Sequence, residues 1–127
     1  MPTNFTIAQN HRDSLKVDLP QAVRELVDTL GPTLVAAAAG IKDRKAPGEW
    51  IAGTRVVRDA AVERRLRLAH RALTAITAHD GPGVARSWFL GGNPLLGEST
   101  PISAIREDRD VEVVRAIDAQ VNDDWTG

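Results

Sequence analysis

Residues 60–78 read AAVERRLRLAHRALTAITA, the clearest helical pattern in the chain. The apolar side chains of this stretch fall three or four positions apart, at Val62, Leu66, Ala69, Leu73 and Ile76. That spacing places them on one face of an α-helix, while arginines cover the other sides. Glu63 also precedes Arg67 by four residues, an ion pair that favours a helix. We therefore predict a long amphipathic helix from about Ala60 to Ala78.

Shorter helical patterns lie on both sides of this stretch and are marked by proline, glycine and capping residues. The predicted segments are 20–30, 34–39, a short helix from about Pro47 to Gly53, 84–90, one or two turns from Pro101 with Thr100 as the cap, and a last helix capped by Asp108 or Asp110. No segment alternates between apolar and polar residues as a half-buried strand does. The sequence therefore predicts an all-α fold.

Length and composition limit the class of protein. A chain of 127 residues makes one small domain with a real core, and the absence of cysteine excludes disulfides and thiolate metal sites. The first residues lack the pattern of a signal peptide, and the longest apolar run, from Leu34 to Ile41, is far shorter than the roughly 20 residues that span a bilayer. We expect a cytoplasmic protein that binds no membrane.

The net charge of −1 hides an asymmetry along the chain. Residues 42–71 contain nine basic and four acidic side chains, whereas residues 98–127 contain three basic and eight acidic ones. A basic middle suits an anionic partner and an acidic tail suits a basic groove, although solvated helix faces alone would give the same pattern.

Residues 26–51 have the helix, glycine turn and helix arrangement of a helix-turn-helix motif. In such a motif the second helix enters the major groove of DNA. Here Pro47 and Gly48 interrupt the second helix, so the motif is degenerate and regular base reading is not expected. The basic residues around the interruption are the candidates for contacts with DNA phosphates: Lys42, Arg44, Lys45 and Arg55.

No catalytic, metal or cofactor site is predicted. The three histidines, His11, His70 and His79, lack metal-ligand spacing, and we expect each of them at the surface. The acidic pairs 108/110 and 123/124 lie where helix caps and solvated tails place carboxylates, with no nucleophile or base beside them. The Gly91 to Pro94 segment has too few glycines for a phosphate loop and is interpreted as a turn.

The aromatic residues divide into core and tail. Trp50 and Trp88 lie among apolar neighbours at helical spacing and are predicted to be buried. Trp125 follows Asp123 and Asp124 near the end of the chain, where nothing local can bury it. It is either an anchor for the cleft of a partner or part of a tail that folds back.

An ordered set of short motifs spans most of the chain, from about Leu26 to Val121. The motifs are Glu49-Trp50-Ile51-Ala52-Gly53, Arg65-Leu66-Arg67-Leu68-Ala69, Ser87-Trp88-Phe89-Leu90, Asn93-Pro94-Leu95-Leu96, Thr100-Pro101-Ile102 and Val113-Val114-Arg115-Ala116-Ile117-Asp118. Each motif alone is weak, but together, in this order and spacing, they resemble the Xre/MbcA/ParS-type antitoxins with their toxin-binding domain.

The resemblance implies a non-enzymatic type II antitoxin with two helical parts, an Xre-like helix-turn-helix region and a C-terminal toxin-binding region. The partner implied is a RES-domain toxin that consumes NAD, and the C-terminal segment of the antitoxin blocks the toxin's active site. Carried over to this chain, the toxin-binding residues are Val121, Asn122, Asp123, Asp124 and Trp125. The acidic tail matches, by charge, the basic pocket expected of a toxin that binds a dinucleotide.

These observations divide the chain into three expected regions. Residues 1–17 are a mobile arm, residues 18–80 form the helix-turn-helix-like region with the long helix, and residues 81–127 form the toxin-binding region with its acidic tail. The resemblance further implies a homodimer or a higher hetero-oligomer with the toxin. The alternative function is a helix-turn-helix transcriptional autoregulator that binds operator DNA.

Overall fold

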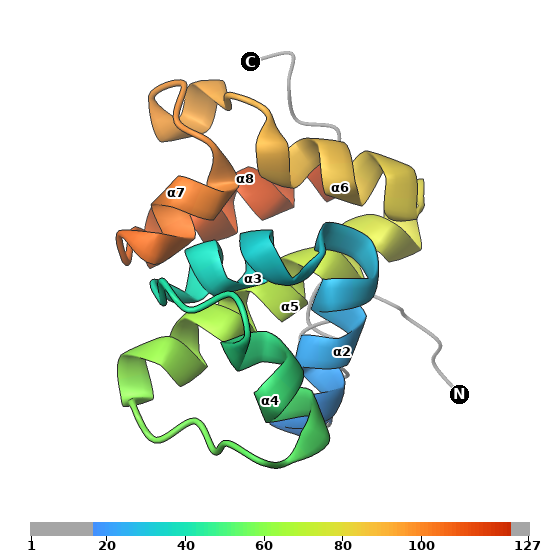
Figure 1. Ribbon diagram of the computed structural model, residues 1–127. Coiled ribbons are helices and arrows are strands. Elements are labelled where there is room, and N and C mark those ends of the chain that lie inside the picture. Colours follow the sequence, from blue (N-terminus) through green and yellow to red (C-terminus); the bar gives the residue numbers. More distant parts are fainter. Residues whose placement is uncertain (1–16, 123–127) are drawn as a thin grey trace, which may run out of the picture.

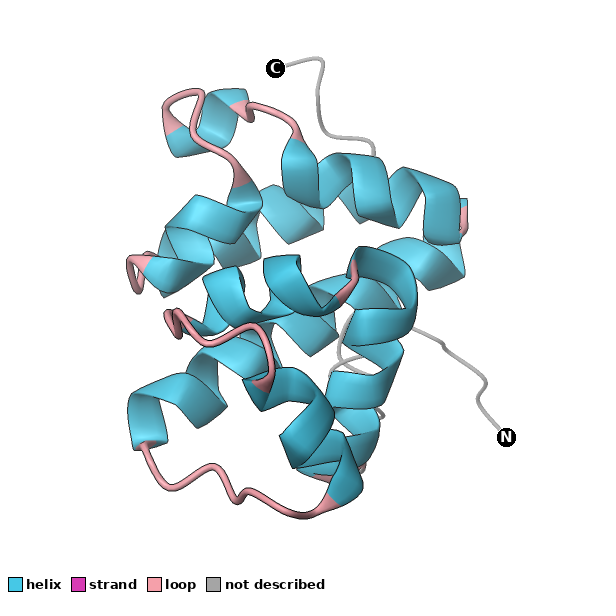
Figure 2. Ribbon diagram, in the orientation of Figure 1, coloured by secondary structure: helices cyan, strands magenta, loops and turns pink. Residues whose placement is uncertain are grey.

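The structure, a computed structural model, describes residues 17–122. Within this range the chain forms seven α-helices, one 3-10 turn and no strand (Figures 1 and 2), as the sequence predicts. The elements are α2 (Leu19–Leu30), α3 (Pro32–Ala39), α4 (Ala46–Ala52), α5 (Ala60–Asp80), α6 (Pro82–Leu90), η1 (Pro94–Leu96), α7 (Pro101–Arg106) and α8 (Asp110–Asn122).

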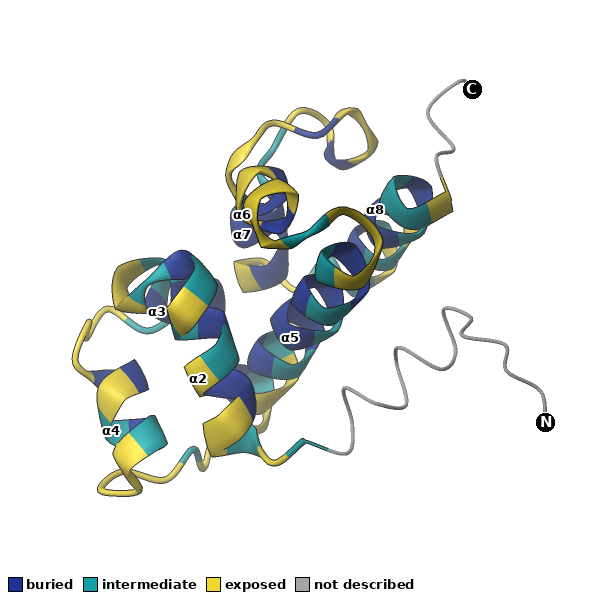
Figure 3. Cartoon of the chain, turned by 90° about the vertical axis from the view of Figure 1, so that its right-hand side faces the viewer, coloured by how far each residue is buried: buried dark blue, intermediate teal, exposed yellow. Residues whose placement is uncertain are grey.

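Helix α5 is the central element of the fold. It packs against α2 and α3 on one side and against α6, α7 and α8 on the other, as Figures 1 and 3 show. All five residues of its predicted apolar stripe are buried, and so are Leu68, Ala72 and Ala75 on an adjoining face. The buried side chains of α2 to α8 form one continuous core. This core is continuous across residues 80 and 81, where α5 gives way to α6.

Local signals set most of the helix ends. The side chains of Asp18, Asp59 and Thr100 accept hydrogen bonds from backbone amides in the first turns of α2, α5 and α7. Helix α4 is short and begins at Ala46, one residue before the predicted proline. The last helix differs from the prediction, because Asp110 is its first residue and the carboxylate of Asp108 is bonded to α5 instead.

One histidine prediction is wrong. His70 is only 1% exposed, and its Nε2 lies 2.7 Å from Oε1 of Glu25 on α2. On the helix His70 lies four residues after Leu66 and three before Leu73, so it extends the apolar stripe sideways toward α2. Burial raises the pKa of Glu25, but hydrogen bonds from His70 and Gln21 outweigh that effect and leave the pKa below its ordinary value.

Two glycines end their helices in the left-handed conformation, Gly40 after α3 and Gly53 after α4, with φ of 79° and 80°. They differ in their surroundings. A Cβ on Gly40 would lie 2.8 Å from Nη1 of Arg65, whereas a Cβ on Gly53 would meet nothing within 4 Å. A comparison of substitutions at the two glycines therefore separates the cost of a positive φ from the cost of a close contact with Arg65.

We expect Gly53→Ala to destabilise the protein by about 1–2 kcal/mol, the strain of a left-handed residue with a side chain. Gly40→Ala should cost about 1 kcal/mol more, because Arg65 must also give up a hydrogen bond. Chemical denaturation of both variants measures the difference. Equal losses of stability would show that Arg65 is not held against Gly40.

Candidate partner-binding surfaces

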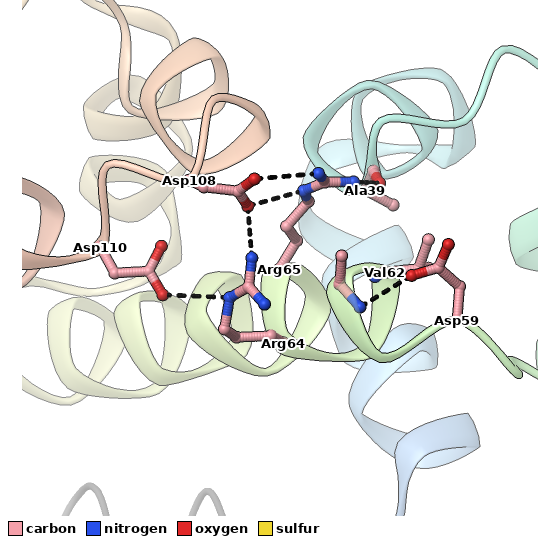
Figure 4. Close-up of polar contacts among 8 residues, drawn as sticks. Ala39, Asp59, Val62, Arg64, Arg65, Asp108 and Asp110 are labelled. Atoms are coloured by element: carbon pink, nitrogen blue, oxygen red, sulfur yellow. Dashed lines mark hydrogen bonds and ion pairs between the residues drawn. The ribbon is translucent and has the colours of Figure 1, made fainter.

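The C-terminal helix is held in place by a cluster of arginines and aspartates (Figure 4). Asp108, between α7 and α8, accepts hydrogen bonds from Arg65 at 2.9 and 3.1 Å and from Arg64 at 2.7 Å. Arg64 also lies 3.4 Å from Asp110, the first residue of α8. Nη1 of Arg65 donates to the carbonyl oxygen of Ala39 at 3.0 Å. One side chain of α5 thus joins the end of α3 to the start of α8.

The cluster depends on an uncommon backbone conformation. Asp108 has a φ of 63°, a left-handed conformation that Asp and Asn tolerate better than most residues. This conformation lets the chain turn between α7 and α8 while the carboxylate points at α5 (Figure 4). Hydrogen bonds from Arg65 and Arg64 lower the pKa of Asp108 from 3.8 to about 2.

Arg109 makes a second set of bonds at the same place. Its guanidinium donates to Leu96 O at 3.0 Å, to Ser99 Oγ at 3.2 Å and to Glu112 Oε2 at 2.6 Å. The η1 segment is therefore tied to the first turn of α8. At the other end of α8, Gln120 donates to Asp80 at 3.1 Å. Helix α8 is thus held by side-chain hydrogen bonds at both of its ends.

The aromatic residues of the sequence motifs are part of the core. Trp50 and Trp88 are 4% and 7% exposed, as predicted, and Phe89 is fully buried. The rings of Trp88 and Phe89 meet edge to face with 5.1 Å between their centroids. Asn93 is buried as well, and its side chain accepts from Leu95 N to start η1. These motif residues belong to the buried core and do not form a surface that a partner could bind.

The predicted toxin-binding residues divide at the end of α8. Val121 is partly buried and packs against the core, and Asn122 is exposed at the last position of the helix. Asp123, Asp124 and Trp125 lie outside the described residues, as do residues 1–16 of the predicted arm.

The predicted phosphate contacts lie around the connection from α3 to α4. Lys42, Arg44 and Lys45 are exposed there. Arg55 differs, because its Nη1 lies 3.2 Å from Asp43 and 3.3 Å from Glu49 and its guanidinium lies 5.9 Å from the centre of the Trp50 ring. Its charge is thus satisfied within the molecule. The three exposed cations remain available to an anionic partner.

Two further hollows occur on the described surface. One, of about 440 Å³, lies between α2 and α5 beside Glu25 and Asp28. Another, of about 250 Å³, lies beneath the loop that joins α4 to α5, where Val56 is 64% exposed. The sequence did not indicate either of them, because each depends on how α5 is placed against segments far from it in the sequence.

No group of three or more His, Asp or Glu side chains among residues 17–122 is placed to hold a metal ion. Over the same residues, every helix is too short or too polar to cross a membrane. Comparison with known protein families, with curated proteins and with solved structures found no match to this chain. The function must therefore be inferred from the residues themselves and from their arrangement in the fold.

The arginine cluster predicts an acid sensitivity. Because the pKa of Asp108 is lower in the folded chain, its stabilising effect is complete above pH 3.8 and is lost as the pH falls toward 2. Asp108→Asn keeps the backbone preference and removes the charge. We expect this variant to be less stable than the native chain at pH 5 in chemical denaturation, and the gap to close near pH 2.

Glu107→Gln is the matched control for this titration. Glu107 precedes Asp108 and is exposed, and its carboxylate lies 3.9 Å from Arg109. Removing the charge of Glu107 should leave the free energy of unfolding nearly unchanged across the same pH range, because exposed ion pairs contribute little to stability. If the difference in stability between Asp108→Asn and the native chain stayed constant between pH 5 and pH 2, the charge of Asp108 would not be what stabilises the fold.

Proposed function

We propose that the protein is the antitoxin of a type II toxin-antitoxin system and neutralises a RES-domain, NAD-consuming toxin. The C-terminal segment that follows α8 blocks the toxin's active site. The observation that carries this proposal is the role of the resembling motifs. Trp88 and Phe89 are buried in the core, and Asn93 and Thr100 cap η1 and α7, two of the elements that pack on α8. In the sequence α8 is followed directly by Asp123, Asp124 and Trp125.

The rigid attachment of α8 supports a blocking mechanism. A short inhibitory segment loses less conformational entropy on binding when its point of departure is already fixed. Arg109 bonds to the first turn of α8 and Gln120 bonds to Asp80 from its last turn, so α8 itself is already held in place before a partner binds. The two carboxylates in that segment complement a pocket that accepts the pyrophosphate of NAD.

Removal of residues 123–127 tests the blocking segment and leaves α8 intact. In bacteria that co-express a RES-domain toxin encoded beside this chain, we expect the truncated chain to lose protection of growth and of cellular NAD. Asp123→Asn with Asp124→Asn should weaken protection in the same direction, since the charges are lost and the size is kept. Full protection by the truncated chain would overturn the blocking mechanism.

The matched control is the triple variant Lys42→Ala, Arg44→Ala and Lys45→Ala. It changes three exposed residues at the connection between α3 and α4 and leaves residues 121–127 unchanged. This variant should protect growth as well as the native chain does. Thermal unfolding of each variant, followed by circular dichroism, separates loss of the fold from loss of the inhibitory contact.

A second candidate function, DNA-binding autoregulation, is favoured by one observation. Lys42, Arg44 and Lys45 are exposed together at the start of α4, where no ion pair within residues 17–122 neutralises Lys42 or Arg44. A degenerate helix-turn-helix could use these cations on DNA phosphates without reading bases. The proposal and this second function are compatible in one chain.

The second function predicts binding to DNA from the upstream region that weakens steeply with salt. Each phosphate contact contributes about 0.9 to the slope of log affinity against log salt concentration. The triple alanine variant should therefore reduce this slope by about 3 in mobility-shift titrations. Arg55→Ala, whose guanidinium is already paired, should change the slope little. An unchanged slope in the triple variant would remove these residues from the interface.

A further inference from the structure

The hollow between α2 and α5 has the size of a site for a small ligand. Its volume is about 440 Å³, within the range of pockets that hold small molecules. Helices α2 and α5 pack side by side, as Figures 1 and 3 show. Both helices contribute to the lining, which includes Glu25, Asp28 and Thr29 of α2 and Leu73, Thr74 and Thr77 of α5.

Helix α2 supplies two carboxylates to this hollow. Glu25 and Asp28 are three residues apart, so they lie on the same side of the helix. Glu25 is held from both sides, because Nε2 of His70 lies 2.7 Å from its Oε1 and Nε2 of Gln21 donates to its Oε2 at 3.0 Å. Burial raises the pKa of Glu25, but these hydrogen bonds outweigh burial and keep the pKa below its ordinary value. The Glu25 carboxylate is therefore fixed in place and charged at neutral pH.

No lysine or arginine of the described chain neutralises these two carboxylates. Among residues 17–122, neither Glu25 nor Asp28 forms an ion pair with such a side chain. Arg86 comes near the end of α2, but its Nη1 donates to the carbonyl oxygen of Thr29 at 2.9 Å. The α2 side of the hollow thus presents acidic groups that attract a cation.

Helix α5 supplies hydroxyl groups and an apolar surface to the same hollow. Thr74 and Thr77 line it together with the buried side chain of Leu73. A threonine within a helix often bonds its hydroxyl to a carbonyl oxygen one turn earlier. Oγ1 of Thr77 is buried but has no hydrogen-bond partner within residues 17–122. Because a buried hydroxyl without a partner is destabilising, a ligand that bonds to it removes a cost of the fold.

This combination of groups fits an aliphatic ammonium ion. An ammonium group has three donors and no acceptor, so carboxylate and hydroxyl oxygens both suit it. A chain of methylene groups packs against an apolar side chain such as Leu73, as the stem of a lysine does. A metal ion fits less well, because no group of three or more His, Asp or Glu side chains in the described part of the chain is placed to hold one. An anion would be repelled by the two carboxylates.

We propose that the hollow between α2 and α5 binds a linear aliphatic polyamine. Glu25 and Asp28 each hold one ammonium group, the methylene chain lies against Leu73, and the hydroxyl of Thr77 accepts a further hydrogen bond. Two carboxylates one helical turn apart favour a molecule with two ammonium groups over a molecule with one. The site uses none of the residues assigned to the toxin or to DNA, so it does not rest on the proposed function.

Calorimetric titration of the full chain at physiological salt concentration tests the class of ligand. We expect putrescine to bind. Butylamine, which has the same carbon chain and one ammonium group, should bind about tenfold more weakly, the effect of losing one hydrogen bond between charged groups. Butanol has the same chain without an ammonium group and should not bind.

Two variants test the residues of the hollow. Asp28→Asn changes an exposed carboxylate and should weaken putrescine binding about tenfold. Thr77→Val replaces the hydroxyl by a methyl group of similar size. It should weaken binding severalfold without lowering the thermal unfolding temperature, because the hydroxyl has no hydrogen bond to lose within residues 17–122.

Glu107→Gln is the matched control, since it also removes one negative charge and Glu107 does not line the hollow. It should leave putrescine binding unchanged. The proposal is overturned if putrescine gives no binding heat at millimolar concentration, if butanol binds as well as putrescine, or if Glu107→Gln and Asp28→Asn weaken binding equally. Toxin neutralisation is scored separately in cells, so the two proposals fail independently.

Discussion

The placement of the helices relative to one another depends on the side chain of Arg65. Its guanidinium bonds to the last carbonyl of α3 and to the carboxylate of Asp108 ahead of α8. It is only 19% exposed, so solvent and salt screen it less than a surface ion pair. Planar, multiple donors allow an arginine to join a carbonyl and a carboxylate at once, which a lysine could not do with the same geometry.

The surfaces of the molecule differ in charge, because different helices around α5 form them. Helix α8 precedes Asp123 and Asp124 in the sequence, the connection to α4 presents exposed cations, and α6 contains a single charged residue, Arg86. The three surfaces belong to different helices around α5. The contacts proposed for a toxin and for DNA therefore involve different parts of the protein, and binding at one surface does not by itself exclude binding at another.

The sequence predicted the helices well, because periodicity, capping and proline act over a few residues. The stripe of α5, the cap at Thr100 and the burial of Trp50 and Trp88 follow from such local patterns. Interactions between distant segments could not be predicted. The sequence predicts that Asp108 or Asp110 caps the last helix. It does not predict the pairing of Asp108 with Arg65, because the two residues are 43 positions apart and no local pattern encodes their contact. His70 was placed at the surface because its acceptor, Glu25, belongs to another helix.

The long separation between Arg65 and Asp108 has a consequence for the synthesis of the chain. The ribosome delivers α5 complete with its arginines well before the carboxylate that anchors them. Until α6 to α8 follow, α5 lacks three of the helices that pack on it, and α3 lacks its link to the C-terminal part. The newly made first 80 residues therefore expose an apolar helix face, and folding is completed only after most of the chain has been released.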